Sequence, residues 1–467
     1  MAVDFKNAPL VFVGYGVSAP ERKWDDFKGV DLKGKLAVVL INDPDFDTGR
    51  GAFGGKAMTY YGRWTYKFEE MARRGAVGTL IVHETAPASY GWDTVKNSNT
   101  NVMYDVVRKE PAKSHAPMEA WIQRDLATAL FKRAGLDFEA ARKQARTRGF
   151  KPVELKGQTL SAQYAVDAQV INSKNVVARI DGSAQPNQYV MYSGHWDHLG
   201  VGLADAKGDT IYNGAVDNAT GISALLEMAR AYAGRPAPKR SVVFMALTAE
   251  ERGLMGSEYY AANPLYPLGS TVGVINMDAL SPYGPARNFS LSGSAKQELL
   301  DRLVATAKKW KVRFSPDPKP EAGHFFRSDH FPFAKRGVPA ISFQSGEDLI
   351  DGGVVKVWRT KKRTRRTITT SRLMNSIQAG RSPAWRATWK SCLPSATTWP
   401  IRPPGRPGPR IRNSAPHATR AQPNASNSTA LHQASLRAGF FRAAGGGRGR
   451  HRYHLVFARR AARVKTR

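Results

Sequence analysis

Side chains that can bind a metal follow the ends of several apolar runs between residues 189 and 280. They are His195 and Asp197 in "MYSGHWDHLG", Asp217 in "NGAVDNATG", Glu250 and Glu251 in "MALTAEERG", and Asp278 in "VINMDAL". Neutral imidazole and carboxylate oxygens suit zinc or a similar first-row metal. A metal of this kind can activate water for hydrolysis. These residue types therefore predict a hydrolytic metal site.

Several carboxylates held close together repel one another and raise one another's pKa, and a divalent cation removes that conflict. Two ions that share a bridging carboxylate, about 3.5 to 4 Å apart, are an established arrangement in hydrolases. Adjacent Glu250 and Glu251 cannot both point the same way from an extended segment. One of them could therefore bind metal while the other faces the water that attacks the substrate.

Each of these pieces also has a purely structural explanation. Asp217 could cap the helix that follows it, and Asp278 could form a turn at the end of a strand. An isolated His-x-Asp or Glu-Glu pair is commonly part of a solvated surface. The placement of all these residues at successive strand ends favours the metal site over those alternatives.

The elements that must position these side chains alternate between strands and helices from Ile171 onward. Strands are expected at 175–182, 188–194, 240–247, 272–280 and 338–345, and helices at 221–233, 253–264 and 295–310. This alternation predicts the α/β class, with a mostly parallel sheet covered by helices on both faces. Ligands of such sheets bind beyond the carboxyl ends of the strands, which is where the candidate residues fall.

The first part of the chain has its own, smaller pattern. Short apolar runs at 10–17, 35–43 and 78–85 surround an amphipathic helix at 62–76, which has a stop signal near Gly75. A small α/β module is therefore expected. A polar, helix-prone segment follows from about Met118 to Gly149, and the pattern changes near Gln158.

From about Ser161 to Gly346 the chain resembles peptidase family M28, the zinc aminopeptidase and glutamate carboxypeptidase-like group. The resemblance rests on "GHWDH", "VDNATG", "AEE", "NMD" and "SDHFPFAKRGVPA", in that order. It implies the zinc exopeptidase fold, which is phosphorylase/hydrolase-like, and a metal-dependent aminopeptidase that acts on peptides. A glutamate carboxypeptidase-like or glutaminyl cyclase-like enzyme is the alternative on the same scaffold.

The resemblance also assigns roles to the candidate residues. It implies two Zn²⁺ ions, or another divalent first-row metal, held by His195, Asp217, Glu251 and Asp278, with Asp217 as the bridge. Glu250 would be the general base, and Asp197 would orient His195. His330, in the last motif, is a candidate for a substrate contact.

Residues from about Pro9 to Ser114 are similar to the protease-associated domain, which many family members carry as an insert. The expected division is therefore an insert with its connecting segment at 1–157, a peptidase domain at 158–353 and a tail at 354–467. Members usually have a signal peptide and further peptidase residues before the insert. The resemblance therefore implies a periplasmic or extracellular enzyme whose chain is truncated here at its start, because "MAVDFKNAPLVFVGYG" lacks the features of a signal peptide.

The tail differs in composition from the rest of the chain. Residues 352–467 hold 26 of the 70 Lys and Arg residues and no acids, which leaves 44 bases against 38 acids and a net charge of +6 for residues 1–351. The family also has a final histidine ligand in a "YHxxxDE"-like segment, which is missing here. Both features predict a reading frame that shifts near Gly352 to Val355. We therefore expect a disordered, out-of-frame basic tail and a chain that is impaired because one histidine ligand is lost.

Two readings from other functional classes stay open. The basic tail could bind nucleic acid, or the chain could be a non-catalytic protein-binding remnant. No nucleic-acid partner is expected for the mildly basic body, no run reaches the length of a membrane span, and residues 1–351 contain no cysteine nucleophile. The sequence leaves open the substrate side chain, the metal bound in the cell and the oligomeric state.

Overall fold

The computed structural model describes residues 2–99, 102–202, 204, 208–293 and 297–357, together with three short strands near the carboxyl terminus. The predicted out-of-frame tail lies outside the described residues, apart from residues 354–357 and those three strands. Among the helices of the described part, none combines the length and the apolar composition that a membrane crossing needs.

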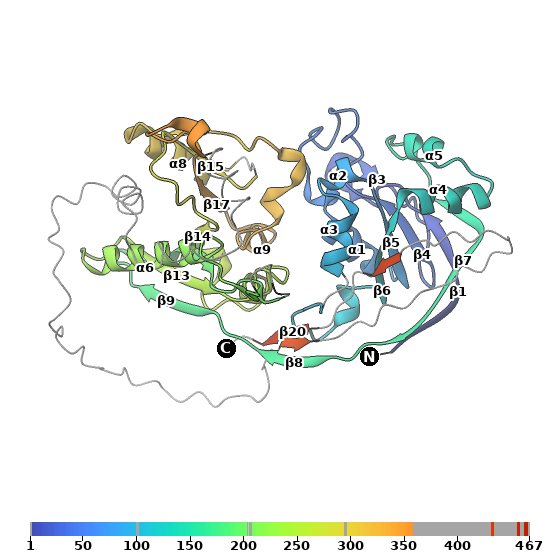
Figure 1. Cartoon of the computed structure of the whole chain (residues 1–467), viewed down its shortest axis with the longest axis horizontal. Coiled ribbons are helices and arrows are strands. Elements are labelled where there is room, and N and C mark those ends of the chain that lie inside the picture. The colour runs from blue at the N-terminus through green and yellow to red at the C-terminus, as the bar shows by residue number, and fades with distance from the viewer. Residues whose placement is uncertain are drawn as a thin grey trace.

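The first part of the chain forms a six-stranded sheet with strand order β19-β6-β5-β4-β1-β7 (Figure 1). Its parallel strands are β1 (Ala2–Phe12), β4 (Leu36–Leu40), β5 (Gly78–His83) and β6 (Met118–Gln123). The antiparallel edge strands are β7 (Val153–Ala165) and β19 (Leu455–Phe457). Helices α1 (Trp64–Arg73), α2 (Thr85–Ala88) and α3 (Trp92–Asn99) lie on one face, and α4 (Arg124–Arg133) and α5 (Phe138–Gln144) on the other.

Strand β4 explains why this sheet has helices on both faces. Leu36 and Val38 belong to the core that includes α4 and α5, whereas Ala37 and Val39 belong to the core that includes α1. Successive side chains of a strand point to opposite faces, so a strand buried on both faces reads as a continuous apolar run. "LAVVL" is such a run, and the predicted α/β module is confirmed.

The second part forms a seven-stranded mixed sheet with order β16-β15-β17-β14-β10-β13-β9. Its strands are β9 (Val176–Ile180), β10 (Gln185–His195), β13 (Arg240–Leu247), β14 (Thr271–Met277), β15 (Asn288–Leu291), β16 (Arg313–Phe314) and β17 (Ala340–Ser345). Strands β13, β10, β14 and β17 are parallel neighbours. Helices α6 (Ala219–Ala233) and α8 (Glu298–Lys309) cover one face, and α7 (Met255–Ala262) and α9 (Phe331–Ala334) the other. The predicted strands and helices of this region are confirmed.

Smaller elements complete the described chain. The short strands are β2 (Ser18–Ala19) with β3 (Trp24–Asp25), β11 (Gly200–Val201) with β12 (Ile211–Tyr212), and β8 (Gln169–Asn172) with β18 (Leu431–Gln433) and β20 (Ala462–Lys465). The 3₁₀ turns are η1 (Pro20–Arg22), η2 (Tyr60–Gly62), η3 (Pro111–Lys113), η4 (Leu268–Ser270), η5 (Pro320–Ala322) and η6 (His324–Phe326).

Two sequence-based expectations about this region need correction. The segment from Met118 is not helical at its start, because "MEAWIQ" is the buried strand β6 and helix α4 begins only at Arg124. The polar Glu119 interrupts the apolar pattern by which this strand could be predicted. The carboxylate of Glu119 forms a hydrogen bond with His115. In addition, the expected boundary at 157/158 lies inside β7, which pairs with β1 as far as Ala165. The identity of this part as a protease-associated insert stays a prediction.

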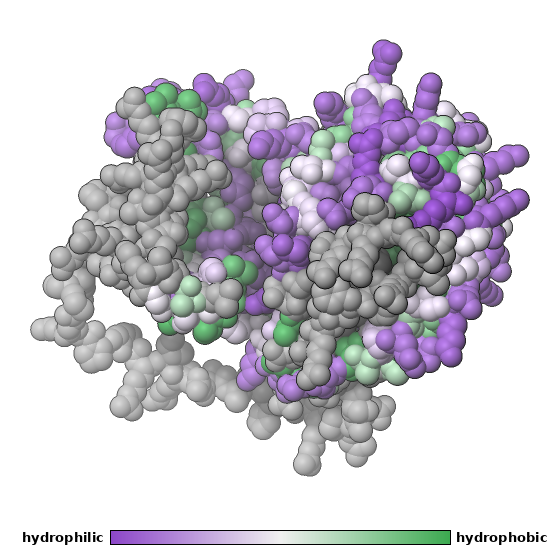
Figure 2. All heavy atoms as spheres, turned by 45° about the vertical axis from the view of Figure 1, so that its right-hand side comes forward, coloured by the Kyte–Doolittle hydropathy of each residue, from purple (hydrophilic) through white to green (hydrophobic). Residues whose placement is uncertain are grey.

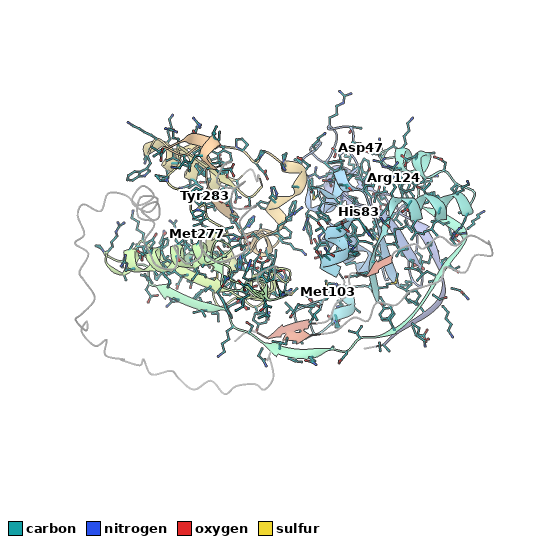
Figure 3. The ribbon with its side chains drawn as sticks, in the orientation of Figure 1. Asp47, His83, Met103, Arg124, Met277 and Tyr283 are labelled. Carbon is teal, nitrogen blue, oxygen red and sulfur yellow. The ribbon has the colours of Figure 1, made fainter. Side chains whose placement is uncertain are left out.

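The two parts contact each other through segment 320–335, and the surface between them is hollowed and largely hydrophilic (Figure 2). Met58 N–H donates to Pro320 O at 3.1 Å, and Lys335 Nζ donates to Tyr60 Oη at 3.0 Å. A separate cavity of about 510 Å³ lies in the first part. Its lining includes Asp47, His83 and Arg124, which Figure 3 shows on the opposite side of the molecule from Met277. The cavity therefore lies away from the predicted metal ligands.

A buried lysine forms hydrogen bonds with two loops in the core of the first part. Lys67 Nζ donates to Tyr15 O at 2.6 Å and to Asn42 O at 3.1 Å. Burial lowers the pKa of Lys67 to about 8, while the charges of Asp43 and Asp26 oppose that shift. Burial raises the pKa of Asp26 to about 7 and that of Asp43 to about 6, and Lys67 opposes both shifts. Lys67 is therefore the cation that balances two buried carboxyl groups.

We predict that Lys67→Met lowers the free energy of unfolding by about 3 kcal/mol at pH 7.5, because it leaves buried carboxylates without a compensating charge. The loss should be smaller at pH 5.5. Without Lys67, the pKa values of Asp26 and Asp43 rise further, so both groups are neutral there. Urea unfolding at the two pH values measures the effect. The exposed control Lys33→Met should change stability by less than about 0.5 kcal/mol. An equal loss at both pH values would contradict this account.

Candidate metal centre

The register of three parallel strands brings the candidate residues to one edge of the second sheet. His195 is the last residue of β10 and lies opposite Leu247, the last residue of β13. Ser193 lies opposite Asn276, so Asp278 directly follows the end of β14 at the same level. The carboxyl ends of parallel strands meet at one edge. Residues that are distant in sequence therefore become neighbours there.

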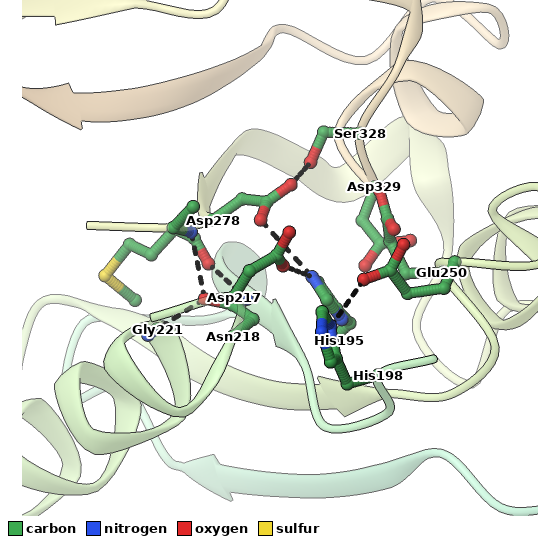
Figure 4. A network of polar contacts seen from close by, with 12 residues as sticks. His195, His198, Asp217, Asn218, Gly221, Glu250, Asp278, Ser328 and Asp329 are labelled. Atoms are coloured by element: carbon green, nitrogen blue, oxygen red, sulfur yellow. Dashed lines mark hydrogen bonds and ion pairs between the residues drawn. The ribbon is translucent and has the colours of Figure 1, made fainter. Parts of the chain in front are cut away.

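Asn218 fastens the start of helix α6 to the end of β14. Its side-chain oxygen accepts hydrogen bonds from Gly221 N at 3.0 Å and Ala279 N at 3.1 Å, and its Nδ2 donates to Met277 O at 3.0 Å. The Asp217–Asn218 peptide bond is cis. Asn218 is thus the helix cap, and Asp217 is left to face the site beside Asp278 (Figure 4).

Two alanines with a left-handed backbone conformation lie next to Glu250 and Asp278. Ala249 has φ 54° and directly precedes Glu250, and Ala279 has φ 51° and directly follows Asp278. Residues other than glycine rarely adopt this conformation, and where they do it often lies at a functional site. The sharp turns let the chain leave each strand while the acids stay at the edge of the sheet.

The first group of candidate ligands consists of His195, Asp217 and Asp278. His195 Nε2 lies 3.0 Å from Asp217 Oδ1 and 3.2 Å from Asp278 Oδ1. The other ring nitrogen, Nδ1, lies 2.9 Å from the main-chain oxygen of Asp197. A donor bond at Nδ1 leaves Nε2 free to bind a metal. Ser328 Oγ donates to Asp278 Oδ2 at 2.6 Å and fixes that carboxylate.

The second group consists of His198, Asp217 and Glu251, so Asp217 is common to both groups. His198 Nδ1 lies 2.7 Å from Glu251 Oε1. His198 is not among the ligands predicted from the sequence. The signal was present in "GHWDHLG", where a second histidine follows the predicted ligand His195 by three residues.

Unsatisfied polar atoms point into the site. Asp217 Oδ1, Glu251 Oε1 and His198 Nδ1 are buried atoms without a hydrogen-bond partner. Buried polar atoms in proteins are nearly always paired, so such atoms need an explanation such as an ion. The three atoms lie close together, yet none of them has the geometry of a hydrogen bond with another. Ligands of one metal ion are arranged in this way. Imidazole and carboxylate donors fit a first-row divalent cation.

The electrostatics of the edge favour a positive charge. Burial alone would lower the pKa of His195, but the nearby carboxylates of Asp197, Asp217 and Asp278 raise it far above its ordinary value. Burial, and then the charges of Asp329 and Asp278, raise the pKa of Glu250 well above the usual range. Burial, followed by the charge of Asp217, raises that of Glu251. A proton or a metal ion would relieve this repulsion.

Asp197 positions other residues in two ways. Its carboxylate accepts hydrogen bonds from Glu250 N at 3.0 Å and Glu251 N at 3.2 Å. Its main-chain oxygen, and not its carboxylate, makes the closer contact with His195, since Asp197 Oδ1 lies 3.6 Å from His195 Nδ1. Asp197 therefore connects the ends of β10 and β13.

His330 lies inside the protein. Its side chain is fully buried against Phe325, and neither ring nitrogen has a hydrogen-bond partner. Burial lowers the pKa of His330 to about 3, so the ring is neutral. This position gives no support to a substrate contact by His330, which stays a prediction. Its neighbour Asp329 is also fully buried and accepts a hydrogen bond from Ser257 Oγ at 2.6 Å.

Residues 175–379 match the family model described as Peptidase family M28. Over this segment the chain is similar to peptidase family M28. The matched range contains every predicted metal ligand and extends into the tail. "Probable zinc metalloprotease" of Pyrenophora teres f. teres is 36% identical over 108 residues, which cover 23% of each chain. Aminopeptidase NAALADL1 of Rattus norvegicus is 35% identical over 113 residues, which cover 23% of this chain and 14% of the rat protein.

Among solved structures, an aminopeptidase from Aneurinibacillus sp. strain AM-1 is similar at 20% identity and a TM-score of 0.34, covering 76% of this chain and 73% of that one. The matched part of this chain spans about a quarter, or less, of the length of the two relatives named above.

We predict that Gly221→Ala disrupts the candidate metal site. An added Cβ would lie 2.3 Å from Met277 O and 2.5 Å from Asn218 Oδ1, so α6 would have to move away from β14. Because Asp217 and Asp278 would separate, divalent metal affinity should fall by about 10- to 100-fold. Metal titration by calorimetry measures this. The control Gly269→Ala meets nothing within 4 Å and should bind metal as the wild type does. Unchanged affinity in Gly221→Ala would contradict the assigned contact.

Proposed function

We propose that this chain is a metal-dependent exopeptidase that works as an aminopeptidase on peptides. The observation that carries the proposal is the pair of three-residue groups that share Asp217 at the edge of the sheet. Two ions bridged by one carboxylate form a recognised hydrolytic centre. The family of residues 175–379 and the name of the rat relative support the same activity.

The residues present fit two zinc ions. Zinc in catalytic sites takes three protein ligands from nitrogen and oxygen donors and keeps a further position open. Each group offers three such residues. When bound, the ions would polarise the substrate carbonyl and lower the pKa of water. The name of the Pyrenophora relative also mentions zinc.

Glu250 is the residue that we propose for proton transfer. Its main-chain N–H is held by Asp197 while its side chain is half-buried among Asp278, Asp329 and His195. A carboxyl group with a raised pKa can accept a proton from the attacking water and give it to the leaving amine. No covalent intermediate on the protein is required. Glu251, the next residue, faces His198 and Asp217 instead.

The proposed function is accompanied by several more detailed predictions. The substrate is a peptide with a free amino terminus, and the protein works in the periplasm or outside the cell, as the resemblance implies. The first sheet acts as a protease-associated insert that contacts segment 320–335, which carries Ser328 and Asp329. The frame change near Gly352 stays a prediction that sequencing of the gene can test.

We predict that Glu250→Gln retains metal but loses turnover. The amide keeps the size of the side chain yet cannot accept a proton, so kcat should fall by about 10²- to 10⁴-fold with little change in KM. Hydrolysis of aminoacyl p-nitroanilides and metal analysis by mass spectrometry measure the two effects. Glu227→Gln, on the exposed side of α6 and paired with Arg230, should leave both unchanged. Full activity of Glu250→Gln would remove Glu250 from this role.

A further inference from the structure

We propose that His198 is a ligand of the second metal ion, which it holds together with Asp217 and Glu251. This inference rests on the proposed function, because it completes the same two-ion centre. It assigns a residue that neither the sequence motifs nor the resemblance marked as a ligand. It gives the second ion a histidine ligand from within the described chain, which is a different residue from the one expected in the missing "YHxxxDE"-like segment.

The contact between His198 and Glu251 is not an ordinary hydrogen bond. The two atoms are only 2.7 Å apart, yet His198 Nδ1 and Glu251 Oε1 are both buried without a hydrogen-bond partner. His115 and Glu119 provide a comparison within the same chain, since their 2.8 Å contact is a hydrogen bond. His198 and Glu251 thus form a close ion pair that lacks good hydrogen-bond geometry. A cation between them and Asp217 would satisfy all three atoms.

The backbone holds His198 at this place. On one side, Trp196 N donates to Leu247 O at 2.9 Å and Trp196 Nε1 donates to Lys174 O at 3.1 Å. On the other side, Arg252 Nη2 donates to Leu199 O at 3.0 Å. The backbone of His198 is therefore anchored through its neighbours on both sides.

Gly214 lets His198 approach the loop that carries Asp217. A Cβ at this position would lie 2.8 Å from His198 Cβ, and φ is +65°, which glycine adopts more readily than other residues. The close passage of these two segments brings the imidazole of His198 within ligand distance of Asp217. The sequence "NGAVDN" supplies this glycine three residues before the shared acid.

The two groups differ in their exposure. The side chain of His195 is 1% exposed, whereas those of His198 and Glu251 are 23% and 18% exposed. Asp278, at 16%, is about as exposed as Glu251, so the difference lies in the histidines, and His198 is closer to solvent than His195. An ion there would retain a position that water or substrate can reach, which is the property of a catalytic zinc site.

The test is zinc binding by the full chain with His198→Ala, His198→Asn and the control His115→Ala. Zinc is counted by mass spectrometry after gel filtration and by calorimetric titration, and peptide hydrolysis is measured in parallel. Histidines elsewhere could add weak sites, so the deciding quantity is the difference from wild type. His198→Ala should bind one equivalent of zinc less, with affinity for the second ion reduced by more than about 100-fold. Replacing a residue that only supports a ligand lowers metal affinity by about 10- to 100-fold, and loss of the ligand itself should lower it further.

His198→Asn separates ligation from a structural role, since the amide keeps a polar group of similar reach beside Glu251. Ligation predicts the loss of one equivalent in this variant too, while His115→Ala keeps the wild-type number. Wild-type stoichiometry in either His198 variant would overturn the proposal. Wild-type protein that binds two ions but cleaves no peptide would defeat the proposed function and leave the ligand assignment intact.

Discussion

The structure depends on one electrostatic constraint, which is the gathering of carboxylates around His195 at the edge of the second sheet. Asp217 and Asp278 approach the same ring nitrogen to within 3.0 and 3.2 Å, while Glu250 and Glu251 lie close by with raised pKa values. Like charges at these distances destabilise the folded state unless a positive charge joins them. A bound cation resolves the conflict, and it is also what a hydrolytic site needs.

The rest of the fold serves to keep this arrangement in place. Parallel strands set the level at which the ligands leave the sheet, and Asn218 joins the loop of Asp217 to the end of β14. Ser328 fixes Asp278 from a segment that contacts the first part of the chain. Supporting contacts of this kind determine how firmly ligands are oriented. The first sheet therefore contributes to the site through the segment it contacts, although it supplies none of the candidate ligands.

Much of this could be predicted from sequence, because the second sheet consists of long apolar strands separated by amphipathic helices, and the acids follow the strand ends. Two features escaped for physical reasons. Strand β6 carries a buried Glu119 whose partner, His115, becomes visible only in three dimensions. His198 lies after β10 at a spacing that fits no helix or strand pattern, and its role depends on the close approach of the loop at Gly214. Side chains that meet in space from different loops show no regular spacing in the sequence.

The most direct test of the account is anomalous X-ray diffraction on either side of the zinc edge, from crystals of the protein grown with zinc. The account predicts an anomalous peak about 2.0 to 2.2 Å from His195 Nε2 and from carboxylate oxygens of Asp217 and Asp278. Ordered density for these three side chains without a peak between them would contradict it. The carboxylates would then be balanced by a protonated His195 alone.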